Sequence, residues 1–283
     1  MLSNNYAYVN GEFVPAARAS VSIYDTGFLF GDGVFETMPV YSGNIFRFER
    51  HVRRLFNGLE QIGIGAPFSA AALQEIFQRI FEGSMVDGVA RVFVTRGPGV
   101  KVLSTKDASQ PTVVAIAWPH VDAPPKQLRA MISSIRIDCE SPLIRIKSAN
   151  RLPYVLAKKQ AELAGMDEAV LLNQHGRVAE MTGYNIFTIN KGRLLTPPVS
   201  EGALSGITRE AVLQLSERLG ISCSEIPLKP ADMADAEEVF ATNSVREIVP
   251  VVGLSRVNAG SRVITERLQV RYRQLVRDEL GIA

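Results

Sequence analysis

The segment Ile144-Arg-Ile-Lys-Ser-Ala-Asn-Arg-Leu152 decides the fold assignment, and it holds Lys147, one of only eight lysines in the chain. Its apolar and basic residues alternate, which is typical of a strand. We therefore expect Ile144 and Ile146 on one face and Arg145 and Lys147 on the other. A lysine at a strand end is ordinarily solvated, because burying an ammonium group is costly. The motifs on either side of the segment give Lys147 a different significance.

Four motifs accompany this segment, one before it and three after it. They are Arg54 in HVRRL, Glu180 in GRVAEMTGYNIF, Gly206-Ile207-Thr208 at the start of a predicted helix, and Ser244 in ATNSVREIVPV. Each motif alone is a weak signal, because a solvated arginine, a strand-edge glutamate and a helix cap are the ordinary explanations. Their order and their flanking residues together are far more specific than any one of them.

In this order, the motifs resemble those of the fold-type IV pyridoxal-phosphate enzymes, from about residue 6 to the C-terminus. That family contains branched-chain aminotransferases, D-amino-acid aminotransferases and aminodeoxychorismate lyase. Gly31-Asp-Gly33 followed by Val34-Phe-Glu-Thr37 is similar to the family's N-terminal signature, in which a glycine-flexed turn leads into a strand that lines the substrate pocket. On its own, this stretch predicts only a turn.

The resemblance implies an α+β fold with two domains, a small N-terminal α/β domain and a larger, β-barrel-like C-terminal domain with helices. Pro119-His-Val-Asp-Ala-Pro-Pro125 is typical of an extended linker, because proline fixes φ and removes a hydrogen-bond donor. We therefore expect a small domain at residues 1–118, a linker at 119–127 and a large cofactor-binding domain at 128–283.

The resemblance makes Lys147 the catalytic lysine that forms a Schiff base with pyridoxal 5′-phosphate. A lysine attacks an aldehyde only as the free amine, so we expect a shielded site beside cationic groups that lower its pKa. Arg54 and Arg145 are the candidate neighbours. Glu180 would pair with the protonated pyridine nitrogen and keep the ring cationic, so that the ring accepts electrons from the substrate.

The cofactor's phosphate needs a site for a dianion, and three parts of the sequence can supply one. Ile207 and Thr208 begin a predicted helix, whose first N–H groups and positive dipole end attract anions. Arg54 offers a two-pronged guanidinium group, and Ser244 offers a hydroxyl. We therefore predict that Arg54, Ile207, Thr208 and Ser244 bind the cofactor together with Lys147 and Glu180.

The candidate substrate residues are Phe30, Phe35, Arg91 and Lys101. Phe30 directly precedes the N-terminal signature, and Phe35 lies within it. Arg91 stands where branched-chain aminotransferases have an arginine that faces the substrate carboxylate, although a surface ion pair is an equally good explanation. Lys101 lies in a glycine-flanked loop, where it could attract a carboxylate but where a solvated lysine is more common.

The sequence departs from each member of the family in one respect. Branched-chain aminotransferases usually carry a tyrosine five residues after the lysine, where this chain has Leu152. The Arg-x-His carboxylate trap of D-amino-acid aminotransferases is replaced by Gly97-Pro-Gly-Val-Lys-Val-Leu-Ser104. That loop is similar in length and start to the one in aminodeoxychorismate lyase, and Asn150-Arg-Leu152 is also similar to the lyase. The departure is that Val100-Lys-Val-Leu-Ser104 replaces the Gly-Arg-Gly-Tyr-Ser of the lyase.

Three functions follow from these comparisons of motifs. The first is an aminotransferase that moves an amino group from a branched-chain-like or D-amino acid to a 2-oxo acid in a ping-pong cycle. The second is a lyase that uses Lys147 to release pyruvate and 4-aminobenzoate from aminodeoxychorismate. The third is a non-catalytic protein that binds pyridoxal phosphate without turnover.

The composition and the net charge of the chain limit the classes of partner that we expect it to bind. The 283 residues amount to about two domains, and a net charge of +2 with scattered basic residues gives no footprint for nucleic acid or an anionic membrane. No apolar run approaches the roughly 20 residues of a membrane helix, and the N-terminus lacks a leader pattern, so we expect a soluble cytoplasmic protein. Two cysteines and three histidines are widely dispersed, so we expect no metal site and no disulfide framework.

Hydrophobic periodicity predicts a succession of short strands and amphipathic helices. We expect a strand meander over 6–48, helices over 52–62, 70–82, 153–164, 207–219 and 261–280, strands over 91–95, 112–118, 131–137 and 168–172, and a hairpin over 186–196 that turns at Lys191-Gly192.

The family resemblance implies a homodimer in which the partner's small domain completes the substrate pocket. The sequence gives this expectation some physical support. Phe28, Leu29, Phe30 and Phe35 bring four bulky apolar residues together near flexible glycines, which is too many to leave in water on a monomer. We expect a two-fold interface there, with residues 24–35 reaching into the neighbour's pocket.

Overall fold

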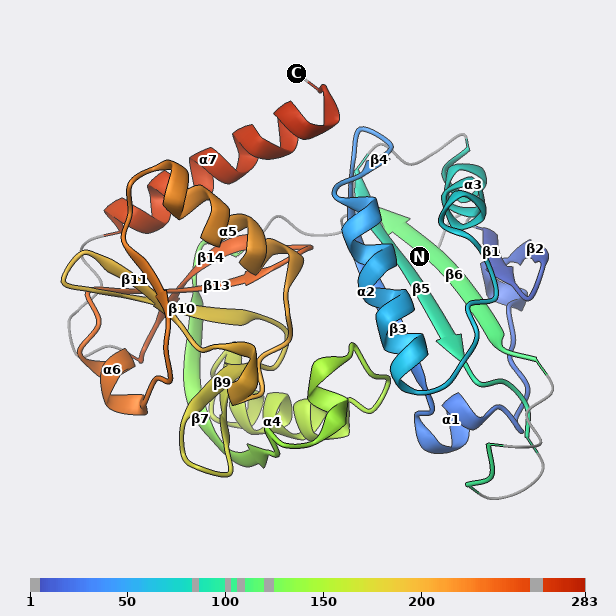
Figure 1. Ribbon diagram of the computed structural model, residues 1–283, viewed down its shortest axis with the longest axis horizontal. Helices are drawn as coiled ribbons and strands as arrows, with labels where there is room; N and C mark the ends of the chain where they lie inside the picture. Colours follow the sequence, from blue (N-terminus) through green and yellow to red (C-terminus); the bar gives the residue numbers. More distant parts are fainter. Residues whose placement is uncertain are drawn as a thin grey trace. The chain divides into compact units, whose positions relative to one another are not determined.

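The computed structural model describes residues 6–82, 87–99, 103–105, 110–119, 125–254 and 262–282. Within them the chain divides into two compact units, each built around its own sheet (Figure 1). Unit 1 consists of Met1–Asp122 with Ile146–Asn150, and unit 2 consists of Ala123–Arg145 with Arg151–Ala283.

Unit 1 contains a six-stranded antiparallel sheet in the order β2-β1-β6-β5-β3-β4. Its strands are β1 (Tyr6–Val9), β2 (Glu12–Pro15), β3 (Gly33–Tyr41), β4 (Asn44–Ile45), β5 (Gly88–Thr95) and β6 (Thr112–Pro119). Two short helices, η1 (Ala16–Arg18) and α1 (Thr26–Phe30), separate β2 from β3. The predicted short strands form two hairpins, β1–β2 and β3–β4, but the predicted meander is wrong, because β1, β6 and β5 lie between β2 and β3 in the sheet. The short helix α1 was not indicated by the periodicity.

Two longer helices, α2 (Phe48–Gln61) and α3 (Ala70–Phe81), cover the sheet of unit 1, as the apolar spacing predicted. The Ser69 side chain accepts a hydrogen bond from the N–H of Ala72 and caps α3. Val34, Met38 and Val40 alternate along β3 and pack with the apolar faces of both helices in one core. The odd-numbered residues of β3, such as Phe35 and Thr37, lie on the opposite face of the sheet.

The strand predicted over Ile144–Leu152 is wrong. A short 3-10 helix, η2 (Pro142–Arg145), occupies its first part, and turns follow it. Proline at the start of η2 fixes φ and lacks a donor for a sheet ladder. Ile146 instead packs into the core of unit 1, where it is buried beside Val34 and the other apolar residues. Arg145 is exposed, so it does not share a strand face with Lys147.

Residues 146–150 belong to unit 1, although the predicted domain limits include them in residues 128–283. The reason is local pairing: Ser148 forms a β-bridge with Val34, and Ala149 donates a backbone hydrogen bond to Gly33 at 3.0 Å. Most of the linker predicted over 119–127 lies outside the described residues. The boundaries at 118 and 128 stay a prediction.

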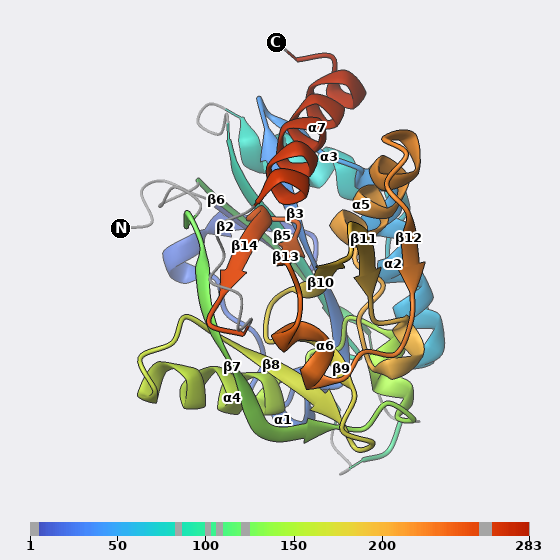
Figure 2. The same cartoon turned by 90° about the vertical axis from the view of Figure 1, so that its left-hand side faces the viewer.

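Unit 2 contains an eight-stranded mixed sheet in the order β12-β11-β10-β13-β14-β7-β8-β9, which curls in Figure 2. Its strands are β7 (Leu128–Ile137), β8 (Glu168–Asn173), β9 (Val178–Met181), β10 (Asn185–Asn190), β11 (Arg193–Thr196), β12 (Cys223–Glu225), β13 (Glu238–Asn243) and β14 (Glu247–Val252). Three pairs are parallel, β11 with β12, β14 with β7, and β7 with β8. The predicted hairpin turns at Lys191-Gly192, where both residues have positive φ.

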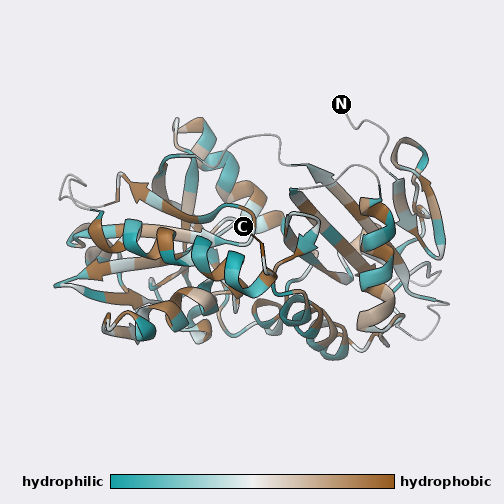
Figure 3. Ribbon diagram, turned by 90° about the horizontal axis from the view of Figure 1, so that it is seen from above, coloured by the Kyte–Doolittle hydropathy of each residue, from teal (hydrophilic) through white to brown (hydrophobic). Residues whose placement is uncertain are grey.

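The helices of unit 2 are α4 (Leu152–Leu163), η3 (Val199–Glu201), α5 (Ile207–Arg218), α6 (Pro230–Ala234) and α7 (Val263–Leu280). Helix α4 packs on β7 and β8 through Ala157 and Ala161, whose small side chains are fully buried. Helix α7, which ends at the marked C-terminus, alternates hydrophobic and hydrophilic turns (Figure 3). None of the helices described here is long and apolar enough to cross a membrane.

Candidate active site

Lys147 is fixed to the start of β3 by backbone pairing. Its carbonyl oxygen accepts a hydrogen bond from the N–H of Phe35 at 3.0 Å, and the next residue forms the bridge to Val34. The half-buried side chain carries its Nζ to 4.8 Å from the centroid of the Phe35 ring. Backbone pairing with β3, the strand of the N-terminal signature, therefore fixes the position of Lys147, which does not lie in a strand of its own.

The glycines of Gly31-Asp-Gly33 are required by this arrangement. Gly31 has a φ of 70° and ends α1, and a Cβ on Gly33 would lie 2.7 Å from the carbonyl oxygen of Val94. Arg96 fixes the turn between them, because its Nε donates to the Asp32 carboxylate at 2.6 Å. The turn and the strand that follows it are therefore held rigidly beside residues 147–149.

A buried ion-paired cluster lies on the helix side of the same strand. Arg54 donates from Nε and Nη2 to the two oxygens of Glu36, at 2.6 and 2.8 Å, and His51 Nδ1 lies 2.8 Å from the same carboxylate. Burial alone would raise the pKa of Glu36, but the Arg54 guanidinium and the His51 hydrogen bond lower it far below its ordinary range. Glu36 is therefore a permanent anion.

His51 is neutral in this cluster. Burial lowers its pKa, and the positive charges of Arg54 and Lys147 lower it further, against the opposing effect of Glu36. Because the charge of Lys147 is one cause of the lowered pKa of His51, the Lys147 side chain lies close enough to the cluster to act on it electrostatically. Sequence reasoning named Arg54 but missed Glu36 and His51. The available signal was the spacing of His51 and Arg54, which puts both on one face of α2.

Arg91 projects from β5 on the opposite face of the sheet from α2 and α3. Its Nε donates to Thr37 Oγ1 at 3.0 Å, and its guanidinium carbon lies 5.1 Å from the ring of Trp118. The Phe35 and Phe93 rings stack on each other at 5.2 Å, and each lies within 6 Å of the same guanidinium group. Burial lowers the pKa of Arg91.

This face of unit 1 combines an arginine with aromatic rings, which suits a carboxylate that carries an apolar side chain. Sequence reasoning did not name Thr37, Phe93 or Trp118 as members of this face. The available signal was the two-residue period of a strand, because Thr37 stands two residues from Phe35 and Phe93 two residues from Arg91. Phe30 lies at the end of α1 and is exposed. Lys101 lies outside the described residues.

Unit 2 holds the second candidate group, around Glu180 on β9. The carboxylate is buried, and its Oε2 accepts hydrogen bonds from the Leu204 N–H at 2.9 Å and from Asn185 Nδ2 at 3.5 Å. Asn185 Nδ2 also donates to the Leu204 carbonyl oxygen at 2.8 Å, which fixes the amide. The carboxylate also lies close enough to Tyr154 to raise the pKa of its phenol, which burial raises most.

Helix α5 begins beside this group. Its N-cap residue, Gly206, makes no side-chain capping bond, and a Cβ there would lie 2.0 Å from Asn185 Oδ1. Ile207 and Thr208 follow and are buried, with the Thr208 hydroxyl 3.5 Å from that of Tyr272. The first N–H groups of α5 thus form an anion-binding end of the kind that suits a phosphate.

Ser244 lies half-buried in the turn between β13 and β14. The predicted site residues of unit 2 are therefore Glu180, Ile207, Thr208 and Ser244, and those of unit 1 are Phe30, Phe35, Arg54, Arg91 and Lys147. Within unit 1 the structure brings Lys147, Phe35 and Arg91 together around one aromatic ring.

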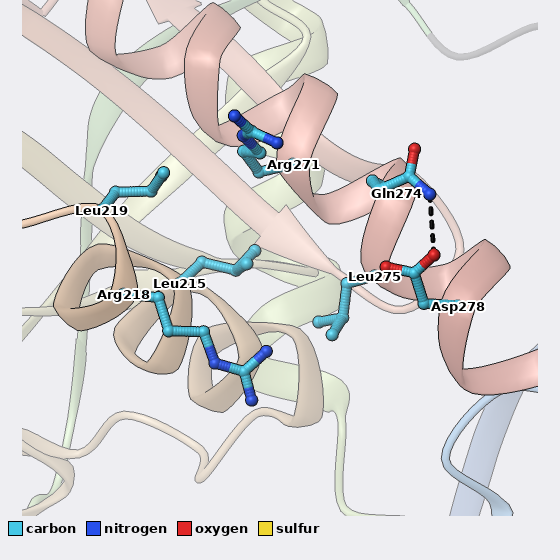
Figure 4. Close-up of a pocket in the computed structure, with 7 residues that line it drawn as sticks. All are labelled: Leu215, Arg218, Leu219, Arg271, Gln274, Leu275 and Asp278. Atoms are coloured by element: carbon cyan, nitrogen blue, oxygen red, sulfur yellow. Dashed lines mark hydrogen bonds between the residues drawn. The ribbon is translucent and has the colours of Figure 1, made fainter.

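A separate pocket lies between α5 and α7 (Figure 4). Leu215 and Leu275 point between the two helices, Arg218 and Arg271 flank them, and Gln274 donates to Asp278 at 2.7 Å. None of the predicted site residues lines it. Its mixed, surface-exposed lining carries no catalytic group, so the candidate chemistry stays with the two groups described above.

Comparison with known proteins agrees with this geometry. Residues 33–254 match the family described as Amino-transferase class IV. The chain is 38% identical to a protein assigned as a branched-chain-amino-acid aminotransferase in Methanocaldococcus jannaschii, over 97% of each chain. It is 32% identical to D-alanine aminotransferase of Bacillus licheniformis over 89% of each chain, and 30% identical to aminodeoxychorismate lyase of Bacillus subtilis over 96% of this chain and 94% of that one.

A solved structure gives the same result. The branched-chain aminotransferase of the thermophilic archaeon Thermoproteus uzoniensis, solved with norvaline, superposes with a TM-score of 0.88, at 28% identity, over 96% of this chain and 94% of that one. The two sheets, with their helices, therefore form the fold-type IV architecture, and the predicted fold class is confirmed. The chain belongs to the class IV aminotransferase family of pyridoxal-phosphate-dependent enzymes.

Proposed function

We propose that this enzyme transfers the amino group of a branched-chain-like or D-amino acid to a 2-oxo acid, in a ping-pong cycle that depends on Lys147. The observation that carries the proposal is the placement of Lys147, with its Nζ beside Phe35 and within the field of the Glu36, His51 and Arg54 cluster. Partial burial beside an aromatic ring favours the free amine of a lysine over its ammonium form, and the free amine is the nucleophile.

The donor set fits pyridoxal 5′-phosphate. When bound, the cofactor supplies an aldehyde for the amino group and a ring that accepts electrons. The buried Glu180 carboxylate, which accepts a hydrogen bond from the Leu204 N–H, suits a cationic ring nitrogen. Within unit 2, the N-terminus of α5 with Thr208 and Ser244 suits the phosphate dianion. Arg54 of unit 1 stays a predicted phosphate ligand.

Each of the candidate site residues has a definite role in this proposal. Lys147 holds the cofactor's aldehyde carbon through Nζ, and as a free amine it moves the proton at the substrate's α-carbon. Glu180 keeps the ring nitrogen protonated. Arg91 binds the substrate carboxylate while Phe35 and Trp118 contact its apolar side chain, which excludes water from the reacting atoms.

One experiment tests the transferase. The purified protein is incubated with an L-branched-chain amino acid or with D-alanine, without any 2-oxo acid, and its absorption spectrum is recorded. A transferase passes its amino group to the cofactor in this half-reaction, so the yellow band fades until a 2-oxo acid is added. A spectrum that responds to neither amino acid contradicts the proposal.

A lyase is the second candidate, favoured by Asn150-Arg151-Leu152 and by the likeness to aminodeoxychorismate lyase. This activity releases pyruvate from aminodeoxychorismate with no 2-oxo acid acceptor present. The transferase proposal expects no such release. A protein that only binds the cofactor would be yellow and inactive in both assays.

We also propose that the enzyme is a homodimer. Unit 1 exposes Ile23, Tyr24, Phe28, Leu29 and Phe30, and unit 2 exposes Leu152, Val155, Leu156 and Leu163 on α4. Phe28 alone is 70% exposed in the single chain. Clusters of this kind are rare on monomers. Light scattering is expected to give about 62 kDa, twice the 31.0 kDa chain; an active monomer contradicts the proposal.

A further inference from the structure

Asn150 joins two stretches of unit 1 that are far apart in the sequence, the glycine turn at Gly31–Gly33 and the segment that follows Lys147. Its side-chain Nδ2 donates to the carbonyl oxygen of Gly31 at 2.8 Å, although the two residues are 119 positions apart. The same nitrogen donates to the hydroxyl oxygen of Ser148 at 3.2 Å. One amide group therefore contacts both the turn and the residue next to the lysine.

The bond from Asn150 to Gly31 extends a ladder that holds the lysine segment on the signature strand. Two backbone hydrogen bonds, each 3.0 Å long, tie Lys147 and Ala149 to residues 35 and 33. The side chain of Asn150 adds a third bond two residues further along, at residue 31. The segment is thus held at three successive points of the turn and of β3.

A side chain makes the third bond at the point where the chain passes into α4. Asn150 is the last residue of this segment of unit 1, and the next residue is the N-cap of α4. The amide packs closely on the turn, because a Cβ on Gly31 would lie 2.8 Å from Asn150 Oδ1. Gly31 is therefore required by this approach as well as by its φ of 70°.

The turn that receives this bond is itself held firmly. Asp32, between the two glycines, accepts hydrogen bonds from Arg96 Nε and Nη2 at 2.6 and 3.0 Å. Arg96 Nη2 also donates to the carbonyl oxygen of Ile62 at 2.7 Å, directly after the end of α2. Because a largely buried arginine ties the turn to a helix, the Gly31 carbonyl oxygen is a fixed point for the lysine segment.

Ser148 fixes the Asn150 amide from the other direction. Its buried hydroxyl oxygen accepts a hydrogen bond from the backbone N–H of Asn150 at 3.0 Å as well as the bond from Nδ2. The backbone bond is typical of a serine turn. The two N–H groups of the amide suit its two acceptors, so the side chain has a defined orientation.

We propose that Asn150 is a positioning residue that fixes the backbone of Lys147 against the glycine turn. A lysine has a long, flexible side chain, so its Nζ reaches a wide region unless the backbone is held. Holding the backbone reduces the entropy that is lost when Nζ bonds to a carbon atom at a fixed position. The inference rests on the proposed function, because it takes Lys147 as the residue that binds the cofactor covalently.

The test compares the affinities for pyridoxal phosphate, whose aldehyde bonds covalently to a lysine, and for pyridoxamine phosphate, which has no aldehyde. Both compounds carry the same ring and phosphate, so the ratio of the two affinities reports on Lys147. We expect Asn150→Ala to bind pyridoxal phosphate about fivefold more weakly, the equivalent of one ordinary hydrogen bond, and to bind pyridoxamine phosphate as wild type does. An equal loss for both compounds, or no loss, overturns the inference.

Asn190→Ala is the matched control. The side-chain Nδ2 of Asn190 also donates to a backbone carbonyl oxygen, that of Asp232 at 3.1 Å, and both residues belong to unit 2. We expect N190A to leave the ratio of the two affinities unchanged. A change equal to that of N150A contradicts the proposal, because the loss of any such amide would then have the same effect.

Ser148→Ala is a second variant that keeps the test decisive if N150A folds poorly. It removes one acceptor of the amide and keeps the bond to Gly31, so we expect a smaller, selective loss for pyridoxal phosphate, about twofold. An unchanged ratio in S148A contradicts the proposal.

Borohydride reduction of the wild-type protein separates this inference from the proposed function. The proposed function expects the reduced cofactor on Lys147. If the wild-type protein retains none there, the proposed function fails and the inference fails with it. If the cofactor is found on Lys147 and N150A keeps the wild-type ratio of affinities, the inference alone fails.

Discussion

Each unit buries a glutamate in its candidate site, Glu36 in unit 1 and Glu180 in unit 2, and the two carboxylates differ in the partners that the structure gives them. Glu36 in unit 1 is held by a two-pronged arginine and by a histidine. Glu180 in unit 2 accepts hydrogen bonds from a backbone N–H and a side-chain amide. The Arg54 guanidinium neutralises the Glu36 charge within unit 1, which suits a structural role. We predict that Glu180 instead pairs with the ring nitrogen of the cofactor.

The largest effect on enzyme turnover is expected from Glu180→Gln. The variant should still bind pyridoxal phosphate at saturating concentration, because the phosphate-binding residues are unchanged. Its turnover should fall on the order of a thousandfold, because a neutral amide does not keep the ring nitrogen protonated. Steady-state kinetics at saturating cofactor measure the loss. Turnover within a few fold of wild type would make Glu180 a structural residue like Glu36 and would end the comparison.

Glu36→Gln should act on stability. The change leaves Arg54 largely buried without its counter-charge, which is expected to cost about 3 kcal/mol in the free energy of unfolding. Urea unfolding of the variant without cofactor measures this cost. The control is Asp167→Asn, which breaks the exposed pair with Arg129 and should cost less than about 1 kcal/mol. Equal costs for the two variants would show that the Glu36 cluster has no special stability.

The smallest expected effect is the pH dependence of stability. Folding lowers the pKa of Glu36. As the pH falls through the ordinary glutamate value of 4.5, the unfolded chain therefore binds a proton at Glu36 and the native state does not. The pKa of His51 is also lowered, so the unfolded chain takes up another near 6.5. Both effects reduce stability as the pH falls, first through 6.5 and then through 4.5. Thermal unfolding between pH 8 and pH 4 is expected to show a shallower decline in E36Q; identical slopes contradict the assignment.

Much of the fold could be predicted from local signals. Helices α2, α3 and α5 follow the apolar spacing and caps of their own residues, and the hairpin at Lys191-Gly192 follows from its turn. The segment around Lys147 could not be predicted in this way. Its alternation resembles a strand, but Ile146 is drawn into the core of unit 1 and the segment pairs with β3. A tertiary contact overrode the local pattern.

The candidate site shows the same division. Family motifs indicated Lys147, Arg54 and Glu180, because each lies within a short run of similar residues. Glu36 was missed, because its importance depends on which neighbours it reaches. Glu36 meets its partners from α2 only through the register of β3 on that helix. Such pairings are properties of the folded chain.

The central claim is that Lys147 carries the cofactor, and one measurement tests it directly. The protein is loaded with pyridoxal phosphate, reduced with borohydride and digested, and the modified peptide is identified by its mass. We expect the modification on Lys147, and we expect Lys147→Ala to give no modified peptide and no activity. A reduced cofactor found on Lys158, Lys159 or Lys229 would contradict the account.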